Sequence, residues 1–261
     1  MPVRLQGDAP IWLYFKGNNE MNRLLVLGVL AALAACSPKQ EAAKEPAAPA
    51  SQPAPAAAAE TPLEAPAGAY KMDPAHTSIL FRVEHLGFSN YTARFKRATG
   101  QLQFDPDNLA ASSVNVVIEA KSLETDFPDA ANYDFNAELL GEGWLNGAKY
   151  PEITFRSLSV EPTGARTMRI NGELSLRGVT RPMVLEARVN GGYRGHPMDP
   201  NARVGFSATG VLKRSDFGIS AGIPAPGTKM GVSDEVNVIV ETEFSGPPMN
   251  SATGEGGAQT K

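Results

Sequence analysis

Cysteine occurs once in this chain, at Cys36, and histidine only three times. One cysteine excludes an internal disulfide and a cysteine cage for a metal, so its position needs another explanation. The histidines are His76, His85 and His196, and they lack the close pairing and the cysteine or aspartate company of common metal sites. We therefore expect no metal site and no cofactor.

Catalytic motifs and nucleic-acid signatures are also missing. The chain has no G-x-S-x-G elbow, no glycine-rich phosphate loop between a strand and a helix, and no visible pair of acidic residues. Its formal net charge is −4, and its basic residues are scattered instead of forming a stripe. We expect no catalytic residues and no nucleic-acid partner.

The apolar run at 24–33 is too short to span a bilayer stably, but it has the basic start and the following small residues of a secretory signal. Residues 33–36, Leu-Ala-Ala-Cys, resemble the lipobox of bacterial lipoproteins, in which the cysteine is diacylated and becomes the mature amino terminus. The alternative is an ordinary signal that is cut nearby and leaves Cys36 unmodified. We assign 1–36 as the signal region, with the true start at Met21 and cleavage before Cys36.

The segments on either side of the central region have a biased composition. Residues 37–69 are almost wholly Ala, Pro, Glu, Lys and Gln, and their prolines block helix propagation and favour an extended, disordered tether. Residues 247–261 are rich in Gly, Ser and Thr and predict a disordered tail. Because Ser37 is not aspartate, a lipid on Cys36 would usually imply the outer membrane. We expect a periplasmic domain anchored to the inner leaflet of that membrane.

The central region, 70–246, shows the alternation of apolar and polar residues that is typical of β-strands. Ile79, Phe81 and Val83 share one apolar face, and the chain returns after a turn signal at 87–90. From 126 to 140 the period changes to about four, with Asp126 as the expected N-cap, which predicts one short amphipathic helix. Further stretches of period two occupy 91–95, 102–104, 114–118, 153–160, 168–176, 183–189, 204–212 and 236–244.

These segments predict an all-β domain of about eight strands with one short helix. A single short helix cannot cover so many strands, so the sheet must either close on itself or fold into a sandwich. Eight antiparallel strands closed into a barrel leave an interior that side chains can fill or that can hold one small ligand. The helical stretch would then cover one opening of the barrel.

Five spaced motifs connect the central region with a known family. Residues 70 to about 245 resemble the YceI-like family of lipocalin-like, polyisoprenoid-binding proteins. The motifs are D-P-x-H-T at 73–77, F-x-V-x-H-L-G at 81–87, Y-P-x-I-x-F at 150–155, L-x-L-R-G-V-T-R-P at 174–182 and R-S-D-F-G at 214–218.

The resemblance implies an antiparallel barrel with an elongated apolar cavity that takes up a long isoprenoid or fatty chain in the periplasm, often in a homodimer. The chain departs from the family pattern where an Asp and a His are usual before the Y-P motif, because Asn136 and Glu138 stand there. Two aromatic positions of the family correspond to Trp144 and Leu145. A head-group contact through that Asp or His is therefore in question, whereas the wall contributed by Trp144 is retained.

Apolar residues expected to face inward are the candidate ligand contacts. The sequence pattern alone favours ordinary core for them, and the family resemblance favours a ligand-lining role. The candidates are Phe81, Val83, Phe88, Phe95, Phe104, Val116, Ile118, Phe127, Leu139, Trp144, Phe155, Ile170, Leu174, Leu185, Phe206 and Val238.

His85, Arg214, Asp216 and Phe217 complete the candidate site. His85 is in register with Phe81, so we expect either a hydrogen-bonded core histidine or a ligand contact. Arg214 and Asp216 either place charge at the barrel mouth for a polar head group, or form a pair that pins a loop with Phe217 as a plug. Carriage of a hydrophobic chain is our first hypothesis. A filled barrel acting as a membrane-tethered interaction module is the second, and a hydrolase or redox accessory is the third.

Overall fold

The structure is a computed structural model that describes residues 63–248. In this part of the chain ten strands form one antiparallel sheet, accompanied by the helix α1 (Phe135–Leu139) and short 3-10 helices that include η4 (Arg214–Phe217). The strands are β1 (Gly68–His85), β2 (Ser89–Phe95), β3 (Ala98–Phe104), β4 (Ser113–Glu119), β5 (Leu123–Glu124), β6 (Glu152–Pro162), β7 (Thr167–Leu176), β8 (Val179–Tyr193), β9 (Asn201–Lys213) and β10 (Val232–Pro248).

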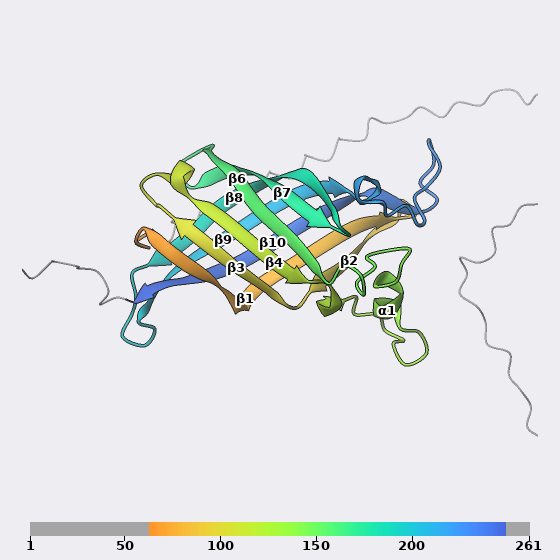
Figure 1. Ribbon diagram of the computed structural model, residues 1–261, viewed down its shortest axis with the longest axis horizontal. Helices are drawn as coiled ribbons and strands as arrows, with labels where there is room; N and C mark the ends of the chain where they lie inside the picture. Colours follow the sequence, from red (N-terminus) through yellow and green to blue (C-terminus); the bar gives the residue numbers. More distant parts are fainter. Residues whose placement is uncertain (1–62, 249–261) are drawn as a thin grey trace, which may run out of the picture. The chain divides into compact units, whose positions relative to one another are not determined.

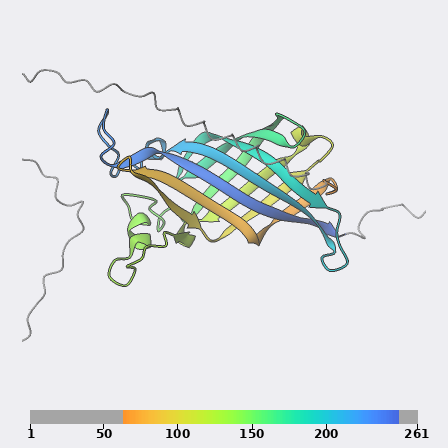
Figure 2. The ribbon, with the colours of Figure 1, turned by 180° about the vertical axis from the view of Figure 1, so that it is seen from behind.

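Eight of the strands close into a barrel. Their order is β10-β9-β8-β7-β6-β4-β3-β1, and a further antiparallel pairing of β10 with β1 completes the ring. The blue strand β10 and the orange strand β1 lie side by side in both views of the ribbon (Figure 1, Figure 2). Closure gives every strand of the ring a hydrogen-bonded neighbour on each side. The prediction of an eight-stranded antiparallel barrel is confirmed, and the sandwich alternative is wrong.

Strand β1 changes neighbours along its length. Gly68–Lys71 pairs with β3, whereas Ile79–His85 pairs with β2, and β10 accompanies both parts. A register irregularity between Met72 and Thr77 separates the two parts, as is common where a strand bends at a bulge. Strand β5 pairs antiparallel with β2, and α1 lies near β2 at one end of the barrel (Figure 1).

The predicted helix is too long. Residues 126–134 are irregular, and α1 covers only Phe135–Leu139. Its N-cap is Asp134, whose side chain accepts a hydrogen bond from the Ala137 N–H at 2.8 Å, whereas Asp126 has a positive φ of 52°. The spacing of Phe127 with later apolar residues reflects aromatic packing in a loop instead of a helical face.

The domain is slightly longer than predicted at both ends. The predicted tether reaches residue 69, but the Glu64 N–H donates to the Gly192 carbonyl at 2.8 Å, and Ala65 is buried. Strand β10 continues into the predicted tail as far as Pro248. The signal, Cys36 and most of the tether and tail lie outside the described residues. Within the described residues, no helix is long and apolar enough to cross a membrane.

Candidate functional site in the barrel interior

Strand register brings many of the predicted lining residues together. Phe81 pairs with Val238, which pairs with Gly210, and Gly210 pairs with Leu185. Leu185 pairs in turn with Ile170. A second row joins Val116, Phe155 and Leu174 across β4, β6 and β7. Because the side chains directly opposite one another in a sheet share a face, each row presents apolar groups to the same side of the wall.

One end of the interior is filled by aromatic side chains. Phe104 contacts Tyr70 at 6.1 Å and Phe206 at 5.7 Å between ring centroids, and Phe206 contacts Phe244 at 5.9 Å, all in edge-to-face geometry. Tyr70 is almost wholly buried, and burial raises its pKa to about 12. The Tyr70 hydroxyl donates to the Pro66 carbonyl at 2.6 Å. The predicted candidates Phe104 and Phe206 therefore lie in a packed part of the core.

Toward the other end the inward-facing side chains remain partly accessible. They belong to the same alternation as the buried core residues, yet side chains do not cover them completely. Since proteins fill their cores to high density, inward apolar groups that water can still reach indicate space that side chains leave vacant. These residues are Phe81, Val83, Phe95, Val116, Ile118, Leu185 and Val238.

The segment around α1 packs on this open end. Leu139 forms a small cluster with Ala93 and Leu123, on which Phe81, Phe95 and Trp144 pack. Phe127 lies in an aromatic group with Tyr133 and Phe135, with ring centroids 5.7 and 5.6 Å from its own. Of the predicted candidates in this segment, Leu139 and Trp144 therefore adjoin the interior, while Phe127 holds the loop together.

Asn136, which stands where the family often has an Asp, fixes this segment to the sheet. Its Oδ1 accepts from the Thr125 N–H at 2.9 Å and the Thr125 hydroxyl at 2.6 Å. Its Nδ2 donates to Glu124 at 3.3 Å. Hydrogen bonds from Lys96, the Asp126 N–H and Asn136 lower the pKa of Glu124 to about 2. The side chain is thus occupied by structural contacts.

Arg214 is buried but makes no pair with Asp216, so the predicted Arg/Asp pair is wrong. Its guanidinium donates to the carbonyls of Ser233 at 2.8 Å, Ala221 at 2.7 Å and Val232 at 2.7 Å, which ties η4 to the following loop and to β10. Burial lowers the pKa of Arg214, and the charge of Asp234 opposes this effect. The hydroxyl of Ser215 donates to Asp234 at 2.7 Å, and Asp216 is exposed.

Two neighbours of Arg214 link it to the interior. The guanidinium lies 5.4 Å from the ring centre of Trp144, within the range of a cation–π contact. Phe217 is 3% exposed and belongs to the main core, as expected for a plug. Arg214 therefore holds a loop in place, as the second interpretation of the motif expected, but it does so through backbone carbonyls and not through Asp216.

His85 is exposed at the end of β1 and is not part of the core. The register irregularity opposite Val83 and His85 lies in β10, whose Val236 and Val232 are their partners, whereas β1 keeps its register with β2 through His85. The prediction of a core histidine is therefore wrong. Phe88, at the tip of the β1–β2 hairpin, is 81% exposed and lines no part of the closed ring.

Sequence reasoning missed an ion-pair network at the filled end. Arg203 on β9 donates to Asp73 on β1 and to Asp199 at 2.7 Å, and its Nη1 lies 3.6 Å from Glu243. His76 bonds Asp73 at 2.9 Å. Asp73, His76 and Thr77 belong to the D-P-x-H-T motif, and the Thr77 hydroxyl also donates to the Asp73 carbonyl at 2.7 Å. This motif was the sequence signal that could have indicated the network.

The side chains of Asp73, His76 and Glu243 come close enough to share a metal ion, with ligand atoms within 4.8 Å of one another. This proximity was not expected from the spacing of the histidines. However, the guanidinium of Arg203 already bonds Asp73 and lies beside Glu243, so a cation is present where a metal would bind. We therefore interpret the group as a brace across β1, β9 and β10.

Fold and interior together define a lipocalin-type barrel, closed by eight antiparallel strands and lined by apolar side chains. The chain belongs to the YceI-like family: the YceI-like domain matches residues 70–244. It is 37% identical over 177 residues to protein YceI of Escherichia coli O157:H7, covering 67% of this chain and 85% of that protein. It is 33% identical over 192 residues to a UPF0312 protein of Vibrio cholerae, covering 72% and 93% of the two chains.

Solved structures agree with the fold. The YceI protein of Campylobacter jejuni matches with a TM-score of 0.53 and 26% identity, over 63% of this chain and 90% of that one. BcnA of Burkholderia cenocepacia matches with a TM-score of 0.54 and 22% identity, over 66% of this chain and 98% of that one.

Proposed function

We propose that this protein binds the hydrocarbon part of a long-chain lipid, such as an isoprenoid or a fatty acyl chain, in the open part of its barrel. The observation that carries the proposal is the set of inward-facing apolar side chains around Phe81, Leu185 and Val238 that remain partly accessible. A side chain that faces inward without being covered leaves room for apolar ligand atoms. Membership of the YceI-like family supports the same function.

Hydrophobic burial is sufficient to drive such binding. Each buried methylene stabilises a complex by about 0.8 kcal/mol, so a ten-carbon stretch gains several kcal/mol after the loss of ligand freedom is subtracted. An alkyl or prenyl chain needs no directional contacts for this gain. We therefore expect chain length to select ligands more strongly than head-group chemistry, and the proposal assigns no catalytic residue.

Native mass spectrometry of freshly purified full-length protein tests the proposal. We expect a fraction of the protein to carry a lipid, and we expect delipidated protein to take up a long-chain fatty acid or decylubiquinone. Protein that carries nothing and takes up neither probe would contradict the proposal and would favour a filled barrel with an interaction role.

We also propose that the domain acts in the periplasm, anchored by a lipid on Cys36 to the inner leaflet of the outer membrane. The support is the lipobox-like sequence at 33–36 and Ser37 at the following position. Mass analysis of the mature amino terminus is expected to show a diacylated Cys36, and Cys36→Ser should release the protein from membranes. An unmodified Cys36 inside a longer mature chain would contradict the anchor.

A further inference from the structure

Strands β8 and β9 stop pairing before either strand ends. Their ladder begins with Leu185 opposite Gly210. Residues 179–184 of β8 still pair with β7, and residues 211–213 of β9 still pair with β10. Two strands that stay in the barrel wall are thus unpaired with each other here. We call this gap the β8–β9 seam.

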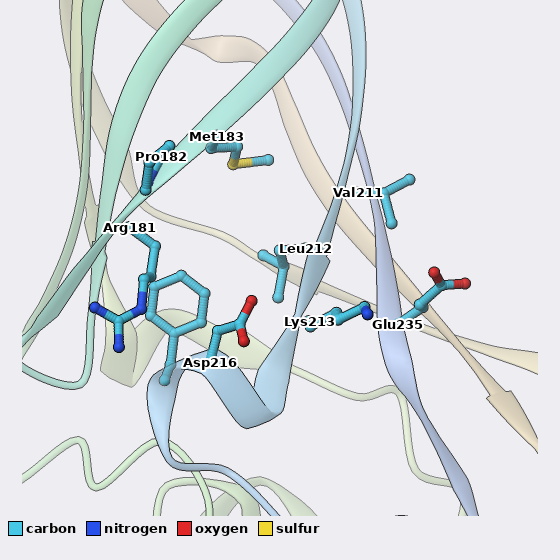
Figure 3. Close-up of a pocket in the computed structure, with 9 residues that line it drawn as sticks. Arg181, Pro182, Met183, Val211, Leu212, Lys213, Asp216 and Glu235 are labelled. Carbon is cyan, nitrogen blue, oxygen red and sulfur yellow. The ribbon is translucent and has the colours of Figure 1, made fainter.

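The seam holds a cavity of about 370 Å³. Its volume lies within the range of roughly 300–1,000 Å³ that is typical of ligand pockets. Met183 from β8, Leu212 from β9 and Phe217 from η4 form its apolar lining, and all three belong to the main core or pack against it. Figure 3 shows Met183 and Leu212 between the two strands.

The outer edge of the seam is apolar as well. Val184 and Val211 project from the outer face and are 42% and 54% exposed, and Pro182 beside them is also exposed. Exposed aliphatic residues are unremarkable one by one. Here they flank a gap whose inner side is Met183 and Leu212, so apolar side chains lie on both the outer and the inner side of the wall at this point.

Met183 obstructs the seam where pairing begins. A Cβ atom placed on Gly210 would lie 2.9 Å from the Met183 Cε and 2.8 Å from the Leu185 Cδ2, so both side chains cover this glycine. Methionine is unbranched and adopts many conformations at little cost. Because no β8–β9 ladder pair is present at this level, the Met183 side chain can move aside without breaking one.

The far end of the seam is held in place and adjoins the open interior. Arg177 donates to the Gly218 carbonyl at 2.7 Å and to the Glu142 carbonyl at 2.8 Å, which ties the β7–β8 turn to the end of η4. Arg214, at the start of η4, stacks on Trp144, which packs against the open end. These contacts fix the position of the seam in the barrel wall, beside the open end of the interior.

We propose that the β8–β9 seam is a side opening through which a hydrocarbon chain passes into the barrel interior, with Met183 as the side chain that closes it. This inference rests on the proposed function. An alkyl or isoprenoid chain is the occupant because Met183, Leu212 and Phe217 give the opening an apolar inner side that joins the core. The rim carries two cationic and two anionic groups, which leaves no net charge to select a charged ligand; they are Arg181, Lys213, Asp216 and Glu235.

The first test blocks the seam from outside. Full-length protein in a Cys36→Ser background receives Val211→Cys and is coupled to a bulky maleimide. The matched control is Thr209→Cys, on the same strand and face but beside the paired Glu186. Uptake of cis-parinaric acid is followed by stopped-flow fluorescence. We expect the label at 211 to slow uptake at least about tenfold and the label at 209 to change it little.

The second test widens the seam. Met183→Ala should accelerate uptake several-fold, whereas Met168→Ala, which removes the same side chain at the filled end, should not. Thermal unfolding is used to check that each variant is folded. Equal uptake rates for both labels and both variants would overturn the side opening and leave the proposed function standing. No uptake by unlabelled protein would overturn both.

Discussion

Single side chains decide whether the ends of this barrel are held together or left open. At the filled end, hydrogen bonds from His76 and Arg203 hold the pKa of Asp73 well below its usual range, and the bond to Asp73 raises the pKa of His76. The network joins β1, β9 and β10, the strands that close the ring. Its contribution to stability must therefore depend on pH.

The sign of that dependence follows from the two shifts. His76 has a raised pKa in the folded protein, so its contribution is complete below its unfolded pKa of about 6.5 and is lost as the pH rises through the folded value. Asp73 has a lowered pKa, so its contribution is lost only in acid, below about pH 4. We expect the stability advantage over His76→Gln to be largest near pH 5 and to shrink toward pH 8.

Melting temperatures of both proteins across this pH range check the prediction. His196→Gln reports the effect of removing an exposed histidine that has no carboxylate bond in the described residues. A difference between wild type and His76→Gln that stays constant from pH 5 to pH 8 would show that the Asp73 contact contributes nothing.

At the scale of strands, close packing depends on where a strand lacks a side chain. On β7, a Cβ atom at Gly172 would lie 2.5 Å from the Phe155 ring and 2.6 Å from the Arg156 carbonyl oxygen. The ring of Phe155, on β6, can lie across β7 only because Gly172 has no side chain. Gly205 on β9 differs, because its nearest neighbour would be 3.9 Å away.

We predict that Gly172→Ala destabilises the protein by about 1–3 kcal/mol, because the new methyl group overlaps backbone as well as the ring. Gly205→Ala is the matched control and should be neutral or stabilising by up to about 1 kcal/mol, since alanine restricts the unfolded chain. Urea unfolding followed by circular dichroism gives both values. Equal effects of the two substitutions would contradict the packing argument.

At the scale of the whole domain, the barrel divides into a filled part and an open part. Val204 on β9 and Val238 on β10 both face inward, but Val204 is 1% exposed among aromatic rings and Val238 remains partly accessible. The same enlargement of the two side chains should therefore have different consequences.

We expect Val204→Trp to destabilise the fold by about 1–3 kcal/mol or more, because the packed end has no room. Val238→Trp should keep a near-normal melting temperature and lower the uptake of a long-chain fatty acid at least about tenfold, or about 1.4 kcal/mol in affinity, because the indole occupies ligand space. Thermal unfolding and fluorescence titration measure the two effects. A destabilised Val238→Trp with unchanged uptake by its folded fraction would show that the interior is filled.

Alternation of residue types along β6, β7, β8, β9 and β10 was sufficient to predict those strands, because a period of two is a local property of the chain. The approximate number of strands and the need for the sheet to cover itself also followed from sequence, since one short helix cannot cover so large a sheet. Closure into a barrel instead of a sandwich did not follow from the residue pattern. The tertiary structure alone decided the change of partners along β1, the exposure of His85, the acceptors of Arg214 and the seam between β8 and β9. Each of these depends on strand register and on contacts between segments far apart in the chain, which local periodicity does not encode.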